Sequence, residues 1–288
     1  MPIIDSQVHA YEANTPKRPW HNVPNWPPHV TGDEMVAAMD KVCVDGAIFI
    51  SAHSLYHYAA SYAVEVQKKH PGRFGLVKPV NPEDPAVEDI IAEWKRTPGT
   101  LGIRIRLQKE KNLPTDHPGL DRIARAAIKH DFPINFLCWG NIDQGTALID
   151  RHPDTRFVLD HLGILQPRKP ELRAAEPWAD LAVKLMLKWP NLYYSTSAFA
   201  PKHYPKAIID YANTRGGDKI MYAGYYPMGL SLERIFSEMP NVPFRDHVWP
   251  KFLRENAARV LGIDVAREGD DASVILPRQG IQAFAPIV

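Results

Sequence analysis

The sequence predicts a single α/β domain of the (β/α)8, or TIM, barrel class. Eight short apolar or β-branched runs alternate along the chain with eight amphipathic stretches of helical period. The runs are too apolar to be half exposed, as is typical of parallel strands covered on both faces. A doubly wound open sheet is the alternative, but no glycine-rich phosphate loop follows the first run.

The expected elements follow one another in a regular order. Strands are expected at 2–9, 45–52, 73–80, 100–107, 132–138, 155–161, 191–198 and 219–224. Helices are expected at 32–42, 57–70, 84–96, 117–130, 141–152, 176–188, 202–215 and 228–238. Several helix starts carry capping residues, such as Thr31 before GDEMVAAM. These eight pairs predict a complete barrel.

The end of the chain is expected to be separate from the barrel repeat. A ninth helical stretch at 247–263 would close a barrel that spans 1–263. The remaining residues, 264–288, are expected to form a C-terminal tail that ends in the apolar stretch IQAFAPIV. Such a tail would pack on the barrel or on a neighbouring subunit, so we expect a homodimer.

Composition narrows the classes of partner. The 288 residues are 45% hydrophobic and 23% charged, with a formal net charge of +1, which gives a large core but no basic field. We therefore expect a small-molecule substrate rather than nucleic acid or an anionic membrane. No signal peptide or membrane span is expected. Cys43 and Cys138 lie in apolar runs and are expected to be buried thiols, or one disulfide, so we predict a cytoplasmic protein.

Polar side chains gather at the ends of the expected strands, where barrels of this class build their active sites. Asp5, Gln7 and His9 point to one side of the first strand by the two-residue period. The other candidates, in chain order, are His53, Tyr56, Arg104, Arg106, Cys138, Trp139, Asn141, Asp160, His161, Ser195, Ser197 and Tyr225. Any one of them has a structural explanation, but their coincidence at so many strand ends favours a functional site.

Arg104 and the loop after the first strand indicate how a substrate would be held. A guanidinium inside a barrel is costly unless it is paired, so Arg104 predicts a carboxylate from Asp or Glu or from a substrate. Arg106 is expected to lie nearer the surface. The proline-rich insertion 15–29 carries Trp20, His21, Trp26 and His29, and is either a pocket wall or a rigid surface loop.

Five stretches together resemble the amidohydrolase-related (amidohydrolase 2) family over about residues 1–263. They are IIDSQVHAYE, GIRI, PDTRFVLDHLGI, GYYPMGLSLERI and FLRENAARVLG, in the family's order. The resemblance implies a (β/α)8 barrel. Members include lactone hydrolases of the 2-pyrone-4,6-dicarboxylate type and metal-dependent nonoxidative decarboxylases.

The resemblance also implies a metal site, but this chain departs from it. The family pattern is His-x-His on strand 1, His on strands 5 and 6, and Asp after strand 8. His9 and His161 match, whereas Gln7, Leu137 or Cys138, and Tyr225 stand at the other positions. Two imidazoles and an amide make a poor zinc cage, so no cofactor is expected. Zinc or another divalent metal on His9, His161 and Cys138 is the alternative.

In this respect the chain resembles the metal-independent lactonase branch of the family. That branch keeps the aspartate after strand 8, whereas this chain has Tyr225 there. The prediction is a hydrolase of a lactone, ester or related carbonyl compound. His9 or His161 is the expected general base, titrating near neutral pH. Tyr225 and Gln7 would stabilise the oxyanion, Arg104 would anchor the substrate, and Trp139, Tyr56, His53 and Asn141 would complete its binding site.

Two other functions stay open. A C–C bond lyase or decarboxylase of the same family would use His and Tyr for proton transfer without activating water. A barrel that has lost catalysis would only bind a small ligand. An oxygenated aromatic or a lactone acid is the expected ligand in each case.

Overall fold

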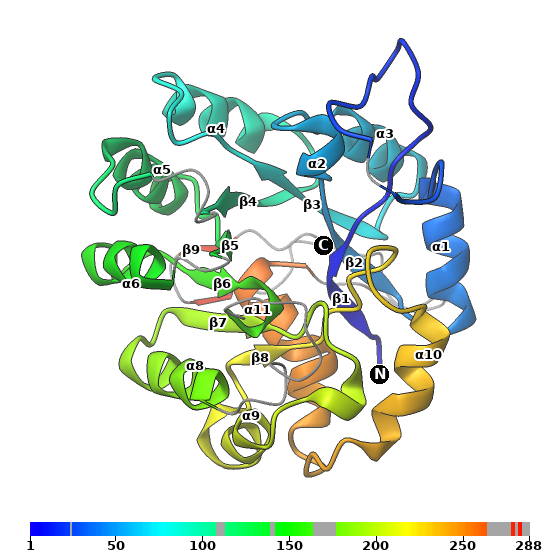
Figure 1. Ribbon diagram of the computed structural model, residues 1–288, viewed down its shortest axis with the longest axis vertical. Coiled ribbons are helices and arrows are strands. Elements are labelled where there is room, and N and C mark those ends of the chain that lie inside the picture. Colours follow the sequence, from blue (N-terminus) through cyan, green and yellow to red (C-terminus); the bar gives the residue numbers. More distant parts are fainter. Residues whose placement is uncertain are drawn as a thin grey trace.

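The computed structural model describes residues 1–263, except 24, 108–112, 139–141 and 164–176, together with 278–279 and 282–283. Its sheet holds eight parallel strands in the order in which they occur in the chain. They are β1 (Ile4–Val8), β2 (Gly46–Ile50), β3 (Phe74–Pro79), β4 (Thr100–Arg106), β5 (Ile134–Leu137), β6 (Phe157–Leu159), β7 (Leu192–Ser195) and β8 (Ile220–Met221). The strands form a ring with the helices outside it (Figure 1), which confirms the predicted barrel.

Backbone and side-chain hydrogen bonds join the first strand to the last. The backbone N–H and the side-chain hydroxyl of Ser6 both donate to the carbonyl of Tyr222, at 2.9 and 2.6 Å. Beyond the strand, the N–H of Tyr225 donates to the carbonyl of Gln7 at 3.0 Å. Asp5 Oδ1 accepts from the N–H of Gly224 at 2.9 Å. We call this contact line between β1 and the β8 region the seam.

The helices follow the expected alternation with local differences. They are α1 (Gly32–Lys41), α2 (His53–Tyr56), α3 (Ser61–Lys69), α4 (Val87–Arg96), α5 (Pro118–Lys129), α6 (Ile142–Arg151), α8 (Pro177–Lys188), α9 (Lys206–Tyr211), α10 (Leu232–Glu238) and α11 (Asn256–Leu261). The predicted helix 57–70 is wrong at its start, because His57 adopts φ +47° and separates α2 from α3. The predicted helix 202–215 is divided into a 3-10 turn, α9 and a π-turn.

Apolar packing fills the amino-terminal end of the barrel. Ile4 and Leu101, near the starts of β1 and β4, lie in one buried cluster with Val260 and Leu261 of α11. The expected closing helix therefore covers this end, and the opposite end is left for polar side chains. A larger apolar cluster packs the helices against the outside of the sheet.

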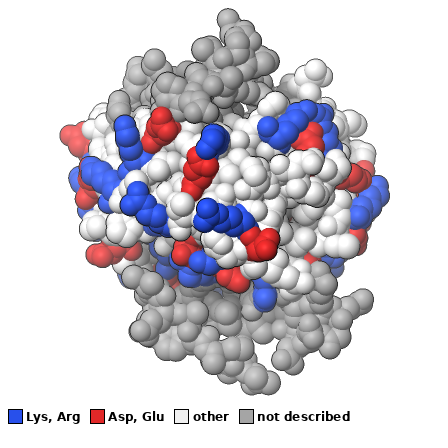
Figure 2. Space-filling view, turned by 90° about the horizontal axis from the view of Figure 1, so that it is seen from below, with Lys and Arg blue, Asp and Glu red and all other residues white. Residues whose placement is uncertain are grey.

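The charged side chains on the surface are of mixed sign. Acidic and basic side chains are interspersed on the face shown in Figure 2, without an extended patch of one sign. None of the helices in the described residues is long and apolar enough to span a bilayer.

Both cysteines are free; Cys138 is buried, but Cys43 is exposed, so its predicted burial is wrong. Cys43 follows α1 at φ +58°, where the chain turns at the surface.

The predicted tail lies largely outside the described residues. Only β9 (Arg278–Gln279) and β10 (Gln282–Ala283) are described, and they pair antiparallel with each other. The division into barrel and tail, the packing of the tail and the dimer remain predictions.

Candidate active site

A cavity of about 170 Å³ opens at the carboxyl-terminal end of the strands. Side chains that follow four different strands reach it, as the sequence predicts for this class of barrel. Its lining residues are His9, Trp26, Ala52, His53, Ser54, Arg104, Arg106, Leu137, His161, Tyr225 and Met228. The structure thus brings His9, His161, Tyr225, Arg104 and His53 together.

His9, directly after β1, is held as a neutral imidazole in one orientation. Its Nδ1 lies 2.6 Å from the carbonyl oxygen of Ile50, which can only accept, so Nδ1 carries the proton. Nε2 is then a hydrogen-bond acceptor. It lies 3.4 Å from Nε2 of Gln7, whose side chain is fully buried beside it. Neighbouring strands therefore fix which nitrogen of His9 can take a proton.

His161 lies on a tight turn rather than in a strand. β6 ends at Leu159, and His161 adopts left-handed backbone angles of φ +57° and ψ +37°. The predicted strand 155–161 is therefore too long. The turn lets the backbone N–H of His161 donate to Ser197 Oγ at 3.0 Å, while its Nδ1 lies 2.7 Å from the same oxygen. Ser197 thus orients this imidazole.

The ring of Tyr225 packs against both His9 and His161. Both contacts are edge-on, with centroid distances of 5.5 and 4.6 Å. The backbone of Tyr225 is left-handed at φ +57°. Its N–H donates to the carbonyl oxygen of Gln7, which is one of the seam hydrogen bonds. An aromatic ring therefore touches both imidazoles that the family would use for metal.

The prediction that these imidazoles titrate near neutral pH is wrong. Burial, then the positive charge of Arg104, lowers the pKa of His9 from 6.5 to about 3. Burial lowers the pKa of His161 to about 4, although Asp160 acts in the opposite direction. Both rings are nearly inaccessible to solvent, so the charged form loses its hydration. Both are neutral at physiological pH.

Asp5 lies below the site as a buried carboxyl group. Oδ1 accepts from the N–H groups of Gln7 and Gly224, and the Tyr222 hydroxyl lies beside the group. Burial outweighs these hydrogen bonds and raises the pKa of Asp5 to about 7. Asp5 therefore stabilises the seam and does not line the cavity.

The carboxylate that Arg104 predicts is Asp160. Nε and Nη2 of Arg104 lie 2.9 and 2.6 Å from Asp160 Oδ2, and both side chains are buried. Asn135 donates to Oδ1 of the same group at 3.2 Å. Arg104 lines the cavity, but its charge is balanced from within the protein.

Arg106 also lines the cavity and, as predicted, lies nearer the surface than Arg104. The two-residue period of β4 brings it to the same side as Arg104, one layer further out. It is half buried and donates from Nη1 to Nδ1 of His53. Burial, then the charge of Arg104, lowers the pKa of Arg106 to about 10, which leaves it protonated.

The remaining predicted residues are placed as follows. Tyr56 does not line the cavity; it is buried, and its hydroxyl accepts from the N–H of Glu12 at 3.1 Å. Trp139 and Asn141 lie outside the described residues. Of the loop 15–29, Trp26 lines the cavity, whereas exposed His29 pairs with Glu34. Ser197 and Arg106 also contribute to the site, and the sequence signals them only by a spacing of two from Ser195 and Arg104.

The residues at the family's ligand positions do not fit a metal ion. In the part of the chain that is described, no three His, Cys, Asp or Glu side chains come close enough to hold one. Gln7 offers only an amide, and burial raises the pKa of the Cys138 thiol to about 12, which disfavours the thiolate that zinc binds.

A sequence model described as amidohydrolase matches residues 4–263. The chain belongs to the amidohydrolase family. This confirms the resemblance to the amidohydrolase 2 family. A search of curated proteins found no match to this amidohydrolase.

Solved structures share its fold at low sequence identity. A probable 2-pyrone-4,6-dicarboxylic acid hydrolase from Acinetobacter baumannii superposes with a TM-score of 0.74 at 15% identity, covering 91% of this chain and 100% of that one. A putative hydrolase of the same kind from Pseudomonas putida gives 0.72 at 12% identity, covering 91% and 97%. The 5-carboxyvanillate decarboxylase from Sphingomonas paucimobilis gives 0.66 at 15%, covering 90% and 98%. Hydrolases and decarboxylases are thus both among its structural neighbours.

Proposed function

We propose that this amidohydrolase hydrolyses a small lactone, ester or related carbonyl compound without a metal. The observation that carries the proposal is the joint placement of His9, His161 and Tyr225 around one cavity with two arginines. Neighbours described as pyrone dicarboxylic acid hydrolases support a lactone as the first substrate class to test.

In the proposed reaction, His9 is the base because its Nε2 is the acceptor nitrogen. A water oxygen adds to the carbonyl carbon while one of its protons passes to His9 Nε2. Collapse of the tetrahedral intermediate breaks the bond between carbon and the leaving oxygen, which takes that proton. Tyr225 and the Gln7 amide would donate hydrogen bonds to the oxyanion.

One observation favours a second candidate, a lyase or decarboxylase. A general base works best with a pKa near the working pH, and burial moves both imidazoles well below it. Cleavage of a C–C bond would need a proton at carbon rather than an activated water. The neighbouring decarboxylase supports testing this class as well.

Product analysis in ¹⁸O-labelled water separates the two. The purified chain would be incubated with 2-pyrone-4,6-dicarboxylate, other lactone acids and hydroxybenzoates, and the products weighed by mass spectrometry. Hydrolysis places one solvent oxygen in the product, whereas decarboxylation releases carbon dioxide and leaves the remaining product unlabelled. Ligand binding without any turnover would instead indicate a barrel that has lost catalysis.

A further inference from the structure

The two arginines that β4 directs into the cavity differ in their partners. Arg104 places two nitrogens on a single oxygen of buried Asp160, so this pair carries no net charge. Arg106 has no Asp or Glu within ion-pair distance among the described residues, and its hydrogen-bond partner is the imidazole of His53. Arg106 is therefore a half-buried positive charge that no carboxylate of the described residues neutralises. Such a charge gains most from an anionic ligand.

His53 positions Arg106 without cancelling its charge. Because the guanidinium can only donate, His53 Nδ1 accepts and its ring proton is on Nε2, so the imidazole is neutral. The ring stacks on His57 with a centroid distance of 5.3 Å, and Tyr58 packs edge-on against it at 5.0 Å. One donor nitrogen of Arg106 is thus fixed, which limits how the rest of the guanidinium can point.

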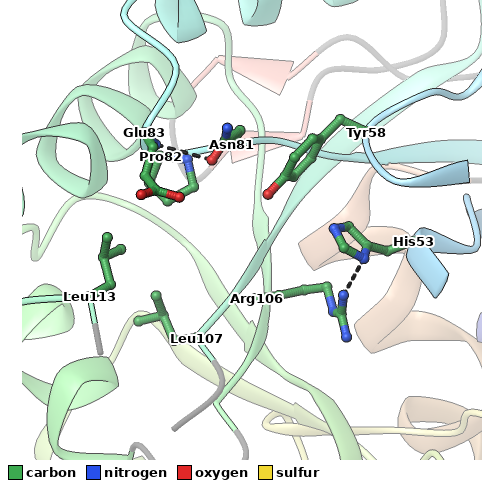
Figure 3. Close-up of a pocket in the computed structure, with 8 residues that line it drawn as sticks. All are labelled: His53, Tyr58, Asn81, Pro82, Glu83, Arg106, Leu107 and Leu113. Atoms are coloured by element: carbon green, nitrogen blue, oxygen red, sulfur yellow. Dashed lines mark hydrogen bonds between the residues drawn. The ribbon is translucent and has the colours of Figure 1, made fainter. Parts of the chain in front are cut away.

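Arg106 and His53 stand where two cavities meet. Both line the cavity of His9 and Tyr225, and both line an adjoining pocket of about 30 Å³. Figure 3 shows Arg106 extending to His53, with Glu83 across this second pocket. The carboxylate of Glu83 disfavours a second anion on that side, so an anion on Arg106 is directed toward the reacting groups.

We infer that Arg106, and not Arg104, binds a carboxylate of the substrate. The inference rests on the proposed function for the identity of the reacting groups, but the binding itself does not need turnover. The planar guanidinium offers parallel N–H donors that match a carboxylate.

Ligand binding to matched variants tests this inference. Benzoate, citrate and 2-pyrone-4,6-dicarboxylate serve as carboxylate probes, and benzamide is the neutral counterpart of benzoate. Binding is measured by calorimetry and by the rise in melting temperature for the wild type, Arg106→Gln, Arg106→Lys and Arg125→Gln. Arg125 is an exposed arginine on α5 and provides the control for loss of one charge.

We expect at least one carboxylate probe to bind the wild type and Arg125→Gln, and benzamide to bind neither. Arg106→Gln should bind that probe about tenfold more weakly or worse, with Arg106→Lys between them and unliganded melting temperatures unchanged. The inference is wrong if no carboxylate binds the wild type, or if Arg106→Gln binds as tightly. Carboxylate binding through Arg106 without hydrolysis of any lactone would overturn only the proposed function. Hydrolysis of a carboxylated lactone with an unchanged kcat/KM in Arg106→Gln would overturn only this inference.

Discussion

Arg104 donates from two of its nitrogens to one oxygen of Asp160, in a pair whose side chains are 6% and 0% exposed. The partners are 56 residues apart in sequence and join β4 to the turn after β6. Removing one partner would leave the other charge buried without compensation.

Arg104→Met is therefore expected to destabilise the fold strongly, by about 3–5 kcal/mol. Urea unfolding monitored by circular dichroism measures this. Arg106→Met is the matched control and should change the free energy of unfolding by less than about 1 kcal/mol, because it leaves no described carboxylate unpaired. Equal losses in the two variants would show that the Asp160 pair has no special structural role.

Asp5 should make stability depend on pH in the direction opposite to an ordinary carboxyl group. Its folded pKa of about 7 exceeds the ordinary value of 3.8, so the folded state holds the proton more tightly. This contribution is complete below about pH 4 and is lost as pH rises toward 7, by about 4 kcal/mol. Asp5→Asn should remove that loss, so its free energy of unfolding relative to wild type should rise between pH 4 and 7. A constant difference across this range would contradict the prediction.

Activity should not show an acid limb near neutrality. The pKa of His9 is about 3, so the imidazole is already neutral, and able to accept a proton, from about pH 5 upward. The pH profile of kcat/KM is expected to stay flat from pH 5 to 8 and to fall only in more acid solution. An acid limb at pH 6 to 7 would indicate a different base or a less buried site in the free enzyme.

His9→Ala should lower kcat by about 10²- to 10⁴-fold if His9 is the base. His161→Ala, which removes a ring held by Ser197, should lower it less, and Ser197→Ala should produce a similar, smaller effect by freeing that ring. Steady-state kinetics and melting temperatures of the three variants check this. Full turnover in both histidine variants would exclude the proposed mechanism.

Chelation should leave the activity unchanged, because the family's ligand positions hold Gln7, Leu137 or Cys138, and Tyr225 in place of the usual ligands. Dialysis against EDTA followed by assay, with metal analysis of the same sample, measures this. As a comparison, Gln7→His with Tyr225→Asp restores two ligand types and should increase zinc binding. A stoichiometric transition metal in the wild type, with activity lost on its removal, would favour the metal-dependent alternative.

The barrel was predictable because its signal repeats eight times, and errors at the ends of elements do not change the strand count. The end of β6 could not be predicted in this way. The left-handed backbone of His161 is held by a hydrogen bond to Ser197, which is 36 residues away in the sequence. A strand pattern alone extends through such a turn.

The roles within the site were less predictable than its members. Period 2 places Arg104 and Arg106 on the same side of β4, but only the fold shows which one meets Asp160. The pKa values of the histidines likewise follow from their burial, which residue type does not reveal. Tyr56 was misplaced because an aromatic residue near a strand end packs equally well into the core.

The seam between β1 and β8 has a consequence for how the protein is made. Gln7 and His9 come from the start of the chain, whereas Tyr225 arrives with the last strand, and the bonds that join them span more than 200 residues, as between Ser6 and Tyr222. A chain still emerging from the ribosome therefore has no complete site until the eighth strand is released. Every unfinished copy therefore lacks the assembled cavity.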